Sequence, residues 1–227
     1  MYFGEVTDPN IRHIFRDAGD FIVRPLKCGK FTLYAYAIDG LTSGADTSEY
    51  VIRPITDNLQ GDTIQALYTS ALRGRVYNSV ADPCRDLDTV ALKLVNGFCV
   101  ILFPEAGAIA FEVKTGEKRG ISAPEVENTV KGAKDAFVET VRTNTSLLRR
   151  HLRSPELRLY ETRVGRRSLT NVTVCYVEGI TNPTLVGRMK KRLNDLDTDG
   201  FLSPAAVEEA VTGSRKTAFP LLQSTER

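Results

Sequence analysis

The stretch "FCVILFPEAGAIAFEV", from Phe98 to Val113, indicates the fold class of this protein most directly. Its first six residues, Phe98–Phe103, are all apolar, as expected of a buried strand. Pro104 and Gly107 then interrupt the apolar run, and a second apolar segment follows them. The stretch therefore predicts a hairpin of two antiparallel strands with its turn at 104–107.

Another hairpin is predicted closer to the start of the chain. Phe21–Lys27 and Phe31–Ile38 are rich in aromatic and β-branched residues, and the segment 28–30, which contains a glycine, forms the turn between them. Three helices are expected in the same part of the chain, at Thr47–Thr56, Thr63–Leu72 and Asp86–Val95, and Asn96-Gly97 is a usual stop for the last of them. Strands and helices in this combination predict one α/β layer over roughly residues 1–115.

The second half of the chain repeats the combination of a hairpin with helices. Strands are predicted at 156–164 and 170–180, with "GRRSL" between them as the turn. Helices are expected at about Ala133–Leu152, Pro183–Leu196 and Pro204–Val211, the second of them opened by Asn182 as its cap. In the first of these helices, four residues at helical spacing form an apolar face, namely Phe137, Val141, Leu148 and Leu152.

A polar segment, Lys114–Pro124, separates the two halves of the chain. It is poor in apolar residues and contains two glycines and a proline, a composition typical of domain boundaries. We therefore predict an α/β fold with two small α/β subdomains joined by a short linker, with mixed sheets built from hairpins and with flanking helices. The first subdomain is predicted to span residues 1–118 and the second 119–227.

The composition excludes several classes of protein. The chain has 227 residues, of which 26% are charged and 42% apolar, as in ordinary globular proteins. Its net charge is only +2, which argues against nucleic acid as a partner. The apolar run ending at Phe103 is far shorter than the ~18–20 residues that a membrane span needs, so we expect a soluble region. The four cysteines and two histidines have no ligand-like spacing, and we expect neither a zinc site nor a disulfide framework.

The segment "DLDTDGFLSPAAVEE", Asp195–Glu209, begins as a calcium loop of the EF-hand type does. Its alternating aspartates and its glycine match the first half of that loop. The position that should hold a bidentate glutamate is instead Ala206. We therefore expect a turn between two helices, with Ser203 capping the second helix, and no calcium site.

Arginines are concentrated between Arg142 and Arg167, where eight arginines and two glutamates give a net charge of +6. On a helix, Arg142, Arg149 and Arg153 would lie within about 40° of one another and form a stripe. Because arginine recognises phosphate and carboxylate groups, the stripe is either a solvated face or a contact for an anionic partner, a lipid surface or another subunit. The candidate partner-binding residues are Arg142, Arg149, Arg153, Arg150, Arg166 and Arg167.

Motifs of enzymatic catalysis are absent from the sequence. It contains no Gly-x-Ser-x-Gly elbow, no phosphate-binding glycine loop and no His-Glu-x-x-His pair. His13 and His151 stand in polar helical contexts, and neither is paired in sequence with a nucleophile. We therefore expect a protein that is not an enzyme and that binds no cofactor.

Several longer segments resemble one family. The segments "FVETVRTNTSLLRRHLRSPELRLYETRVGRRS", "YVEGITNPTLVGRMKKRLNDLDTDG" and "AFPLLQSTER" are similar to the A subunits of GerA-type spore germinant receptors and to the related stage V sporulation AF proteins. In the first half of the chain, "YAIDGL" and "LVNGFCVILF" extend the resemblance, which covers nearly the whole chain.

The resemblance implies a location and partners that composition does not. It implies the cytoplasmic region of a protein of the spore inner membrane, leading into a membrane domain that is absent from this chain. Its partners would be the B and C subunits of the same receptor, further A subunits and the inner membrane surface. The implied function is to couple nutrient sensing and subunit assembly to an ion channel during germination. The alternative function is a sensor with a small ligand between the two subdomains.

Overall fold

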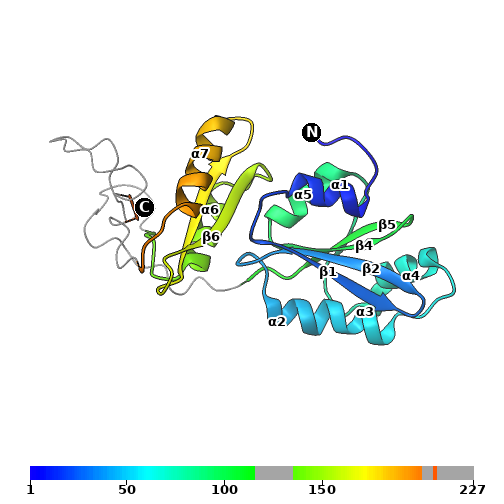
Figure 1. The fold of residues 1–227 in the computed structure, drawn as a ribbon. Helices are drawn as coiled ribbons and strands as arrows, with labels where there is room; N and C mark the ends of the chain where they lie inside the picture. Colours follow the sequence, from blue (N-terminus) through cyan, green and yellow to red (C-terminus); the bar gives the residue numbers. More distant parts are fainter. Residues whose placement is uncertain (116–134, 201–206, 209–227) are drawn as a thin grey trace. The chain divides into compact units, whose positions relative to one another are not determined.

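The computed structural model describes residues 1–115, 135–200 and 207–208 (Figure 1). Its contacts divide the chain into two compact units. The first unit contains Met1–Glu117 and Thr145–Leu157, and the second contains Lys118–Asn144 and Arg158–Arg227. The segment Thr145–Leu157 thus packs with the first unit, although the boundary expected at residue 118 would assign it to the second. That the two subdomains fold separately stays a prediction.

The first unit is built on a five-stranded sheet with the strand order β1-β2-β4-β5-β3. The strands are β1 (Phe21–Cys28), β2 (Phe31–Ile38), β3 (Ala81–Cys84), β4 (Phe98–Phe103) and β5 (Gly107–Glu112). Each strand is antiparallel to its neighbours, and both predicted hairpins are confirmed. The sequence did not indicate β3, because its Pro83 is unusual inside a strand; an edge strand tolerates a proline.

Helices cover both faces of this sheet, and the three predicted helices are confirmed. The first unit contains α1 (Asp8–Ile14), α2 (Gly44–Asp46), α3 (Arg53–Asn58), α4 (Ile64–Ser70) and α5 (Leu87–Val95), together with the π-helical turns η1 (Thr47–Ile52) and η2 (Ala71–Arg75). Val100 of β4 packs in a core with α1 and α5, whereas the next residue, Ile101, packs in a core with α3 and α4. Helices lie on both faces of the sheet (Figure 1), and successive side chains of a strand point to opposite faces, so every residue of β4 is buried.

Gly97 ends α5 in the way that the sequence predicts. Its φ is +82°, a left-handed conformation that favours glycine, and its N–H donates to the carbonyl of Leu94 at 3.0 Å. A Cβ at this position would lie 2.8 Å from the backbone oxygen of Leu41. The chain can therefore pass directly from α5 into β4 only because residue 97 has no side chain.

The second unit contains a two-stranded sheet and a helix. Its strands are β6 (Leu157–Val164) and β7 (Thr170–Val177), and the helix α7 (Pro183–Asn194) follows them. Val164 and Leu193 are the buried centre of a small core, against which Val172 and Met189 pack. Asn182 caps α7, since its side chain accepts the N–H of Thr184 at 2.9 Å. The third predicted hairpin and the helix after it are confirmed.

The predicted helix from 133 to 152 is shorter in the structure and buries other residues. It is α6 (Val141–His151), and residues 135–140 before it are not helical. The reason is Asn144, whose side chain binds both the N–H and the carbonyl of Val138, at 2.7 and 2.6 Å. The predicted apolar face was also wrong, because Leu147 and Arg149 are buried while Leu152 is 42% exposed.

Two further predictions concern segments that lie mostly outside the described residues. One is the linker Lys114–Pro124, of which the structure describes only the first two residues. The other is the short helix expected at Pro204–Val211, together with its cap at Ser203. The mixed α/β class itself is confirmed by the two sheets and their helices.

Candidate functional site

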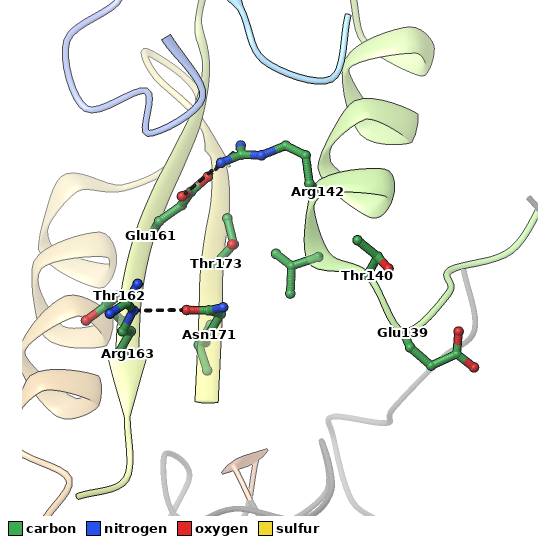
Figure 2. Close-up of a pocket in the computed structure, with 10 residues that line it drawn as sticks. Glu139, Thr140, Arg142, Glu161, Thr162, Arg163, Asn171 and Thr173 are labelled. Atoms are coloured by element: carbon green, nitrogen blue, oxygen red, sulfur yellow. Dashed lines mark hydrogen bonds and ion pairs between the residues drawn. The ribbon is translucent and has the colours of Figure 1, made fainter. Parts of the chain in front are cut away.

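A polar pocket lies in the second unit, between the start of α6 and the β6–β7 hairpin (Figure 2). Its volume is about 540 Å³. The wall from α6 and the segment before it consists of Glu139, Thr140, Val141 and Arg142. The wall from the hairpin consists of Glu161, Thr162, Arg163, Asn171, Val172 and Thr173.

An ion pair crosses this pocket from the helix to the sheet. The guanidinium of Arg142 donates to both carboxylate oxygens of Glu161, at 2.8 and 3.3 Å (Figure 2). Both side chains remain about a third exposed. On the hairpin, Arg163 Nε donates to Asn171 Oδ1 at 3.3 Å. Because the pocket presents two acids, two arginines and several hydroxyl groups, it suits a small polar molecule that carries charges of both signs.

Arg149 does not form part of an exposed stripe, which corrects the interpretation of α6. Its side chain is fully buried and donates twice to Asp20, from Nε and Nη2, at 2.8 Å each. A third bond runs from Nη1 to the backbone oxygen of Ser154 at 3.2 Å. Asp20 is likewise buried, so the pair lies inside the first unit and cannot meet a partner.

The other candidate arginines are divided between the two units. Arg153 is exposed and donates to Asn96 at 3.3 Å, while Arg150 is half-buried and makes polar contacts of its own. Arg166 and Arg167 are exposed in the β6–β7 turn. The structure therefore places the six candidates in the pocket, in a buried ion pair, at one half-buried position and at three exposed positions. Their binding of an anionic partner stays a prediction.

The aspartates that resemble a calcium loop face the turn between β6 and β7. Arg166 pairs with Asp197 at 2.9 Å, and the backbone N–H of Arg167 donates to the carbonyl of Asp199 at 2.8 Å. Two of the carboxylates that calcium would need are thus beside arginine side chains. Over residues 1–115, 135–200 and 207–208, no three His, Cys, Asp or Glu side chains gather as a metal site would require.

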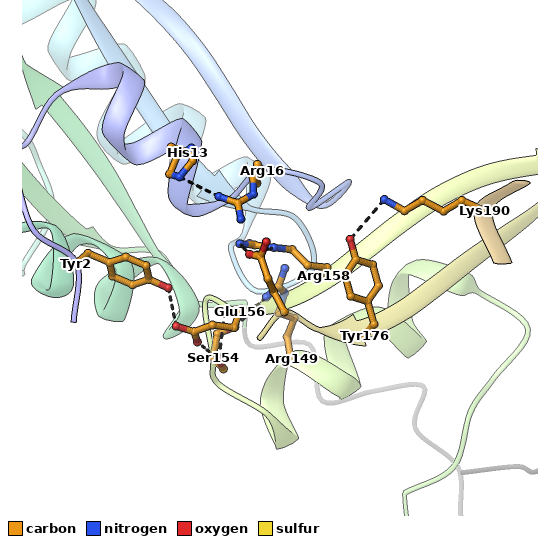
Figure 3. Close-up of polar contacts among 10 residues, drawn as sticks. Tyr2, His13, Arg16, Arg149, Ser154, Glu156, Arg158, Tyr176 and Lys190 are labelled. Atoms are coloured by element: carbon orange, nitrogen blue, oxygen red, sulfur yellow. Dashed lines mark hydrogen bonds and ion pairs between the residues drawn. The ribbon is translucent and has the colours of Figure 1, made fainter. Parts of the chain in front are cut away.

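Other polar side chains are tied into local networks. Tyr2 donates its hydroxyl to Glu156 at 2.6 Å, which connects the start of the chain to the segment after α6 in the first unit (Figure 3). In the second unit, Arg158 is buried and pairs with Glu178. His13 lies 2.8 Å from Arg16 on the surface, as expected of a histidine in a polar context. These networks stabilise the fold.

Sequence reasoning missed the pocket and the partner of Arg149. Glu161 and Arg142 are 19 positions apart, and Asp20 and Arg149 are 129 apart, so no local spacing connects either pair. One signal was present, because Glu161 is one of only two acids among the arginines of that stretch.

The described part of the chain holds no helix with the length and apolar character that a membrane crossing requires. Comparison with known proteins gives a match over residues 9–227 to the family model described as Bacillus/Clostridium GerA spore germination protein.

Individual relatives match over much of this chain. The stage V sporulation protein AF of Bacillus subtilis (strain 168) is 34% identical over 158 residues, which are 69% of this chain and 32% of that protein. The spore germination protein GerLA of Bacillus cereus is 29% identical over 224 residues, which are 96% of this chain and 44% of that protein. The chain thus spans less than half the length of these relatives.

A solved structure has the same fold. The crystal structure of the N-terminal domain of the A subunit of the Bacillus megaterium spore germinant receptor GerK3 superposes with a TM-score of 0.67. The match covers 96% of this chain and 81% of that chain, at 21% sequence identity.

Proposed function

This chain belongs to the GerA family of Bacillus and Clostridium spore germination proteins, and from that premise we propose that it couples nutrient sensing and subunit assembly to an ion channel in the spore membrane. The chain would be the N-terminal region of a germinant receptor A subunit or of a stage V sporulation AF relative. The observation that carries the proposal is the family match over residues 9–227, which includes parts of both compact units.

The names of the relatives support the membrane part of this proposal. One relative, 27% identical over 201 residues, is the membrane protein YfkQ of Bacillus subtilis (strain 168). The A subunit would act with B and C subunits and with further A subunits, and this region would lie on the cytoplasmic side of the inner membrane. Regulation by contact between subunits is consistent with the lack of catalytic motifs, and the proposed role is not enzymatic.

The proposal is tested in spores of a host that carries the full-length gene. A strain without the gene, a strain complemented with the full-length gene and a strain complemented with an allele lacking residues 9–227 are compared. Nutrient-triggered release of potassium and dipicolinic acid is measured, together with the amount of the protein in the membrane fraction. Only the full-length allele should restore ion release. If the shortened protein accumulates in the membrane and restores normal release, the coupling role is excluded.

The exposed candidate arginines allow a finer test of partner contact. Replacing Arg153, Arg166 and Arg167 by glutamine removes charge without touching the buried Arg149. Exposed charges contribute little to stability, so the 227-residue chain should keep its melting temperature. Germination of spores that carry the full-length variant should slow, because an anionic contact is lost. Normal germination would identify these arginines as a solvated surface.

The pocket favours sensing of a small ligand as a second function. The sequence suggested a ligand between the subdomains, whereas the pocket lies within the second unit. Its paired Arg142 and Glu161 would bind the opposite charges of a zwitterion. Nuclear magnetic resonance titration of the chain with individual amino acids should shift amide signals of β6 and β7. The double variant R142Q/E161Q should abolish those shifts. No shift with any nutrient would exclude this second function and leave the coupling role intact.

A further inference from the structure

The helix α7 carries a concentration of positive charge that is separate from the candidate site. Its twelve residues include four basic residues and no acidic one, namely Arg188, Lys190, Lys191 and Arg192. At 100° per residue, Arg188 lies within about 60° of Lys191 and within about 40° of Arg192. All three are exposed, whereas Leu193 on the opposite side is buried in the core. One side of α7 is therefore basic and accessible.

Lys190 has a different role from the other three. Its ammonium group donates to the hydroxyl of Tyr176 at 3.4 Å (Figure 3). It also lies 4.5 Å from the ring centre of Tyr160. It is thus held against the β6–β7 hairpin. By contrast, Arg188 and Lys191 form no ion pair with any residue that the structure describes. Asp195, directly after the helix, is the nearest acid in the sequence.

Two exposed aliphatic side chains lie in the first turn of this helix and in the turn just before it. Ile180, in the turn after β7, is 83% exposed, and Leu185, in the first turn of α7, is 49% exposed. Leu185 lies about 60° from Arg188 around the helix. We call these five residues, Ile180, Leu185, Arg188, Lys191 and Arg192, the α7 surface.

We propose that the α7 surface docks on the anionic headgroups of a phospholipid bilayer. Cations at the end of a helix complement its dipole, but the dipole does not account for exposed aliphatic side chains beside them. A membrane interface accounts for both the cations and the aliphatic side chains, because its anionic headgroups attract basic residues and its acyl boundary accepts apolar ones. A free phosphate ion would engage the charges alone.

This inference rests on the proposed membrane location of the protein but on none of the residues of the pocket. Relatives of this chain are more than twice as long as the matched region, so a chain of this family has further residues through which the region can be tethered near a bilayer. An exposed basic and aliphatic surface on a tethered domain would set its orientation. Each basic residue close to an anionic bilayer strengthens its binding several-fold.

The test is sedimentation of the 227-residue chain with protein-free vesicles. Vesicles of phosphatidylcholine alone are compared with vesicles that also contain phosphatidylglycerol, at about 0.1 M salt, where exposed charges still attract over roughly 10 Å. The chain should sediment with the anionic vesicles only. The variant R188Q/K191Q should bind them roughly thirtyfold more weakly, and I180S/L185S should also bind more weakly.

A matched control is available on the first unit. Arg73 and Arg75 are exposed and, like Arg188 and Lys191, form no ion pair in the described part of the chain. The variant R73Q/R75Q removes the same charge and should bind the anionic vesicles as the unaltered chain does. Melting temperatures establish that all three variants are folded.

Four outcomes would overturn the proposal. The first is no binding of the unaltered chain to anionic vesicles. The second is an equal loss in R73Q/R75Q and R188Q/K191Q, which would show only a general attraction of charge. The third is binding to membranes that contain the receptor subunits but not to protein-free vesicles, which would identify an acidic protein surface as the partner. Inorganic phosphate at millimolar concentration should not compete, and full competition would point to a phosphate site instead. None of these outcomes bears on whether the full-length protein is needed for ion release.

Discussion

At the scale of single residues, two arginines of one helix have opposite environments. Arg142 and Arg149 both belong to α6 and project from nearly the same side of it. Arg142 stays about a third exposed beside Glu161, whereas Arg149 is fully buried with Asp20. Both residues are arginines on nearly the same side of one helix, so neither residue type nor position on the helix distinguishes them. The difference in their environments comes from the partner that folding brings to each side chain.

The buried pair should be essential for the stability of the first unit. Removing one partner leaves an uncompensated buried charge, so R149Q and D20N should each destabilise the chain by about 3–5 kcal/mol in urea unfolding. The exposed R166Q is the control and should change the unfolding free energy little, because its side chain is 67% exposed. Equal effects of R149Q and R166Q would contradict the importance of the buried pair.

The four cysteines should differ in reactivity. Cys28, Cys84 and Cys99 are buried, and burial raises the pKa of Cys84 to about 11 and that of Cys99 to about 12. Because the thiolate is the reactive form, these thiols should react slowly near pH 8. Cys175 is exposed, so a thiol reagent should label one group rapidly in the native protein and all four after denaturation. The C175S variant should lose the rapid phase, and a rapid phase that persists would contradict this assignment.

At the scale of elements, the ends of helices and the turns between strands were the parts that short sequence patterns predicted. Gly97 ends α5, and Asn182 begins α7. The predicted start of α6 was wrong, because Asn144 holds Val138 in a conformation outside the helix. A side chain that bonds to the backbone ahead of a helix competes with the helix itself.

Gly97 can be tested with a matched glycine. G97A places a Cβ in the left-handed region and 2.8 Å from the backbone oxygen of Leu41, so we expect a loss of about 1–3 kcal/mol. Gly44 begins α2, and a Cβ there would meet nothing within 4 Å. G44A should therefore be nearly neutral or slightly stabilising in thermal unfolding. Comparable losses in both variants would mean that the close approach to Leu41 is unimportant.

The Asp197–Gly200 loop should not respond to calcium. Its carboxylates face Arg166 and Arg167, and the sequence offers Ala206 where a bidentate acid is needed. Millimolar calcium should leave the melting temperature unchanged, since only binding to the folded state would raise it. A rise that D197A abolishes would show that the loop binds calcium.

At the scale of the whole molecule, the two units differ in the size of the core that is described. The first unit has two apolar clusters, one on each face of its sheet. The cluster described in the second unit has two fully buried residues, Val164 and Leu193. A two-stranded sheet with a small core has little independent stability.

Hydrogen exchange should therefore be slower in the first unit. Amides of β4, where every residue is buried, should remain protected longer than amides of β7, whose residues are half-buried or exposed. Mass spectrometry of peptides from the two strands measures the difference. Equal protection in β4 and β7 would show that the two units unfold together.

The sequence by itself determined the elements that depend on neighbours in the chain, and the family to which the chain belongs. The three hairpins follow from apolar runs and turn residues, and the expected helix stops follow from glycine and asparagine at their ends. These features need only contacts between residues a few positions apart. Family resemblance likewise resides in the order of residues.

Only the tertiary structure decided which of these residues are buried and which meet. It pairs β3 with β5 despite a proline, brings Asp20 to Arg149 across 129 positions, and forms the pocket from α6 and the hairpin. It also shows that the basic residues of α7 are exposed beside aliphatic side chains. The physical reason is that burial and charge pairing depend on distances in space, which packing sets and which spacing along the chain does not encode.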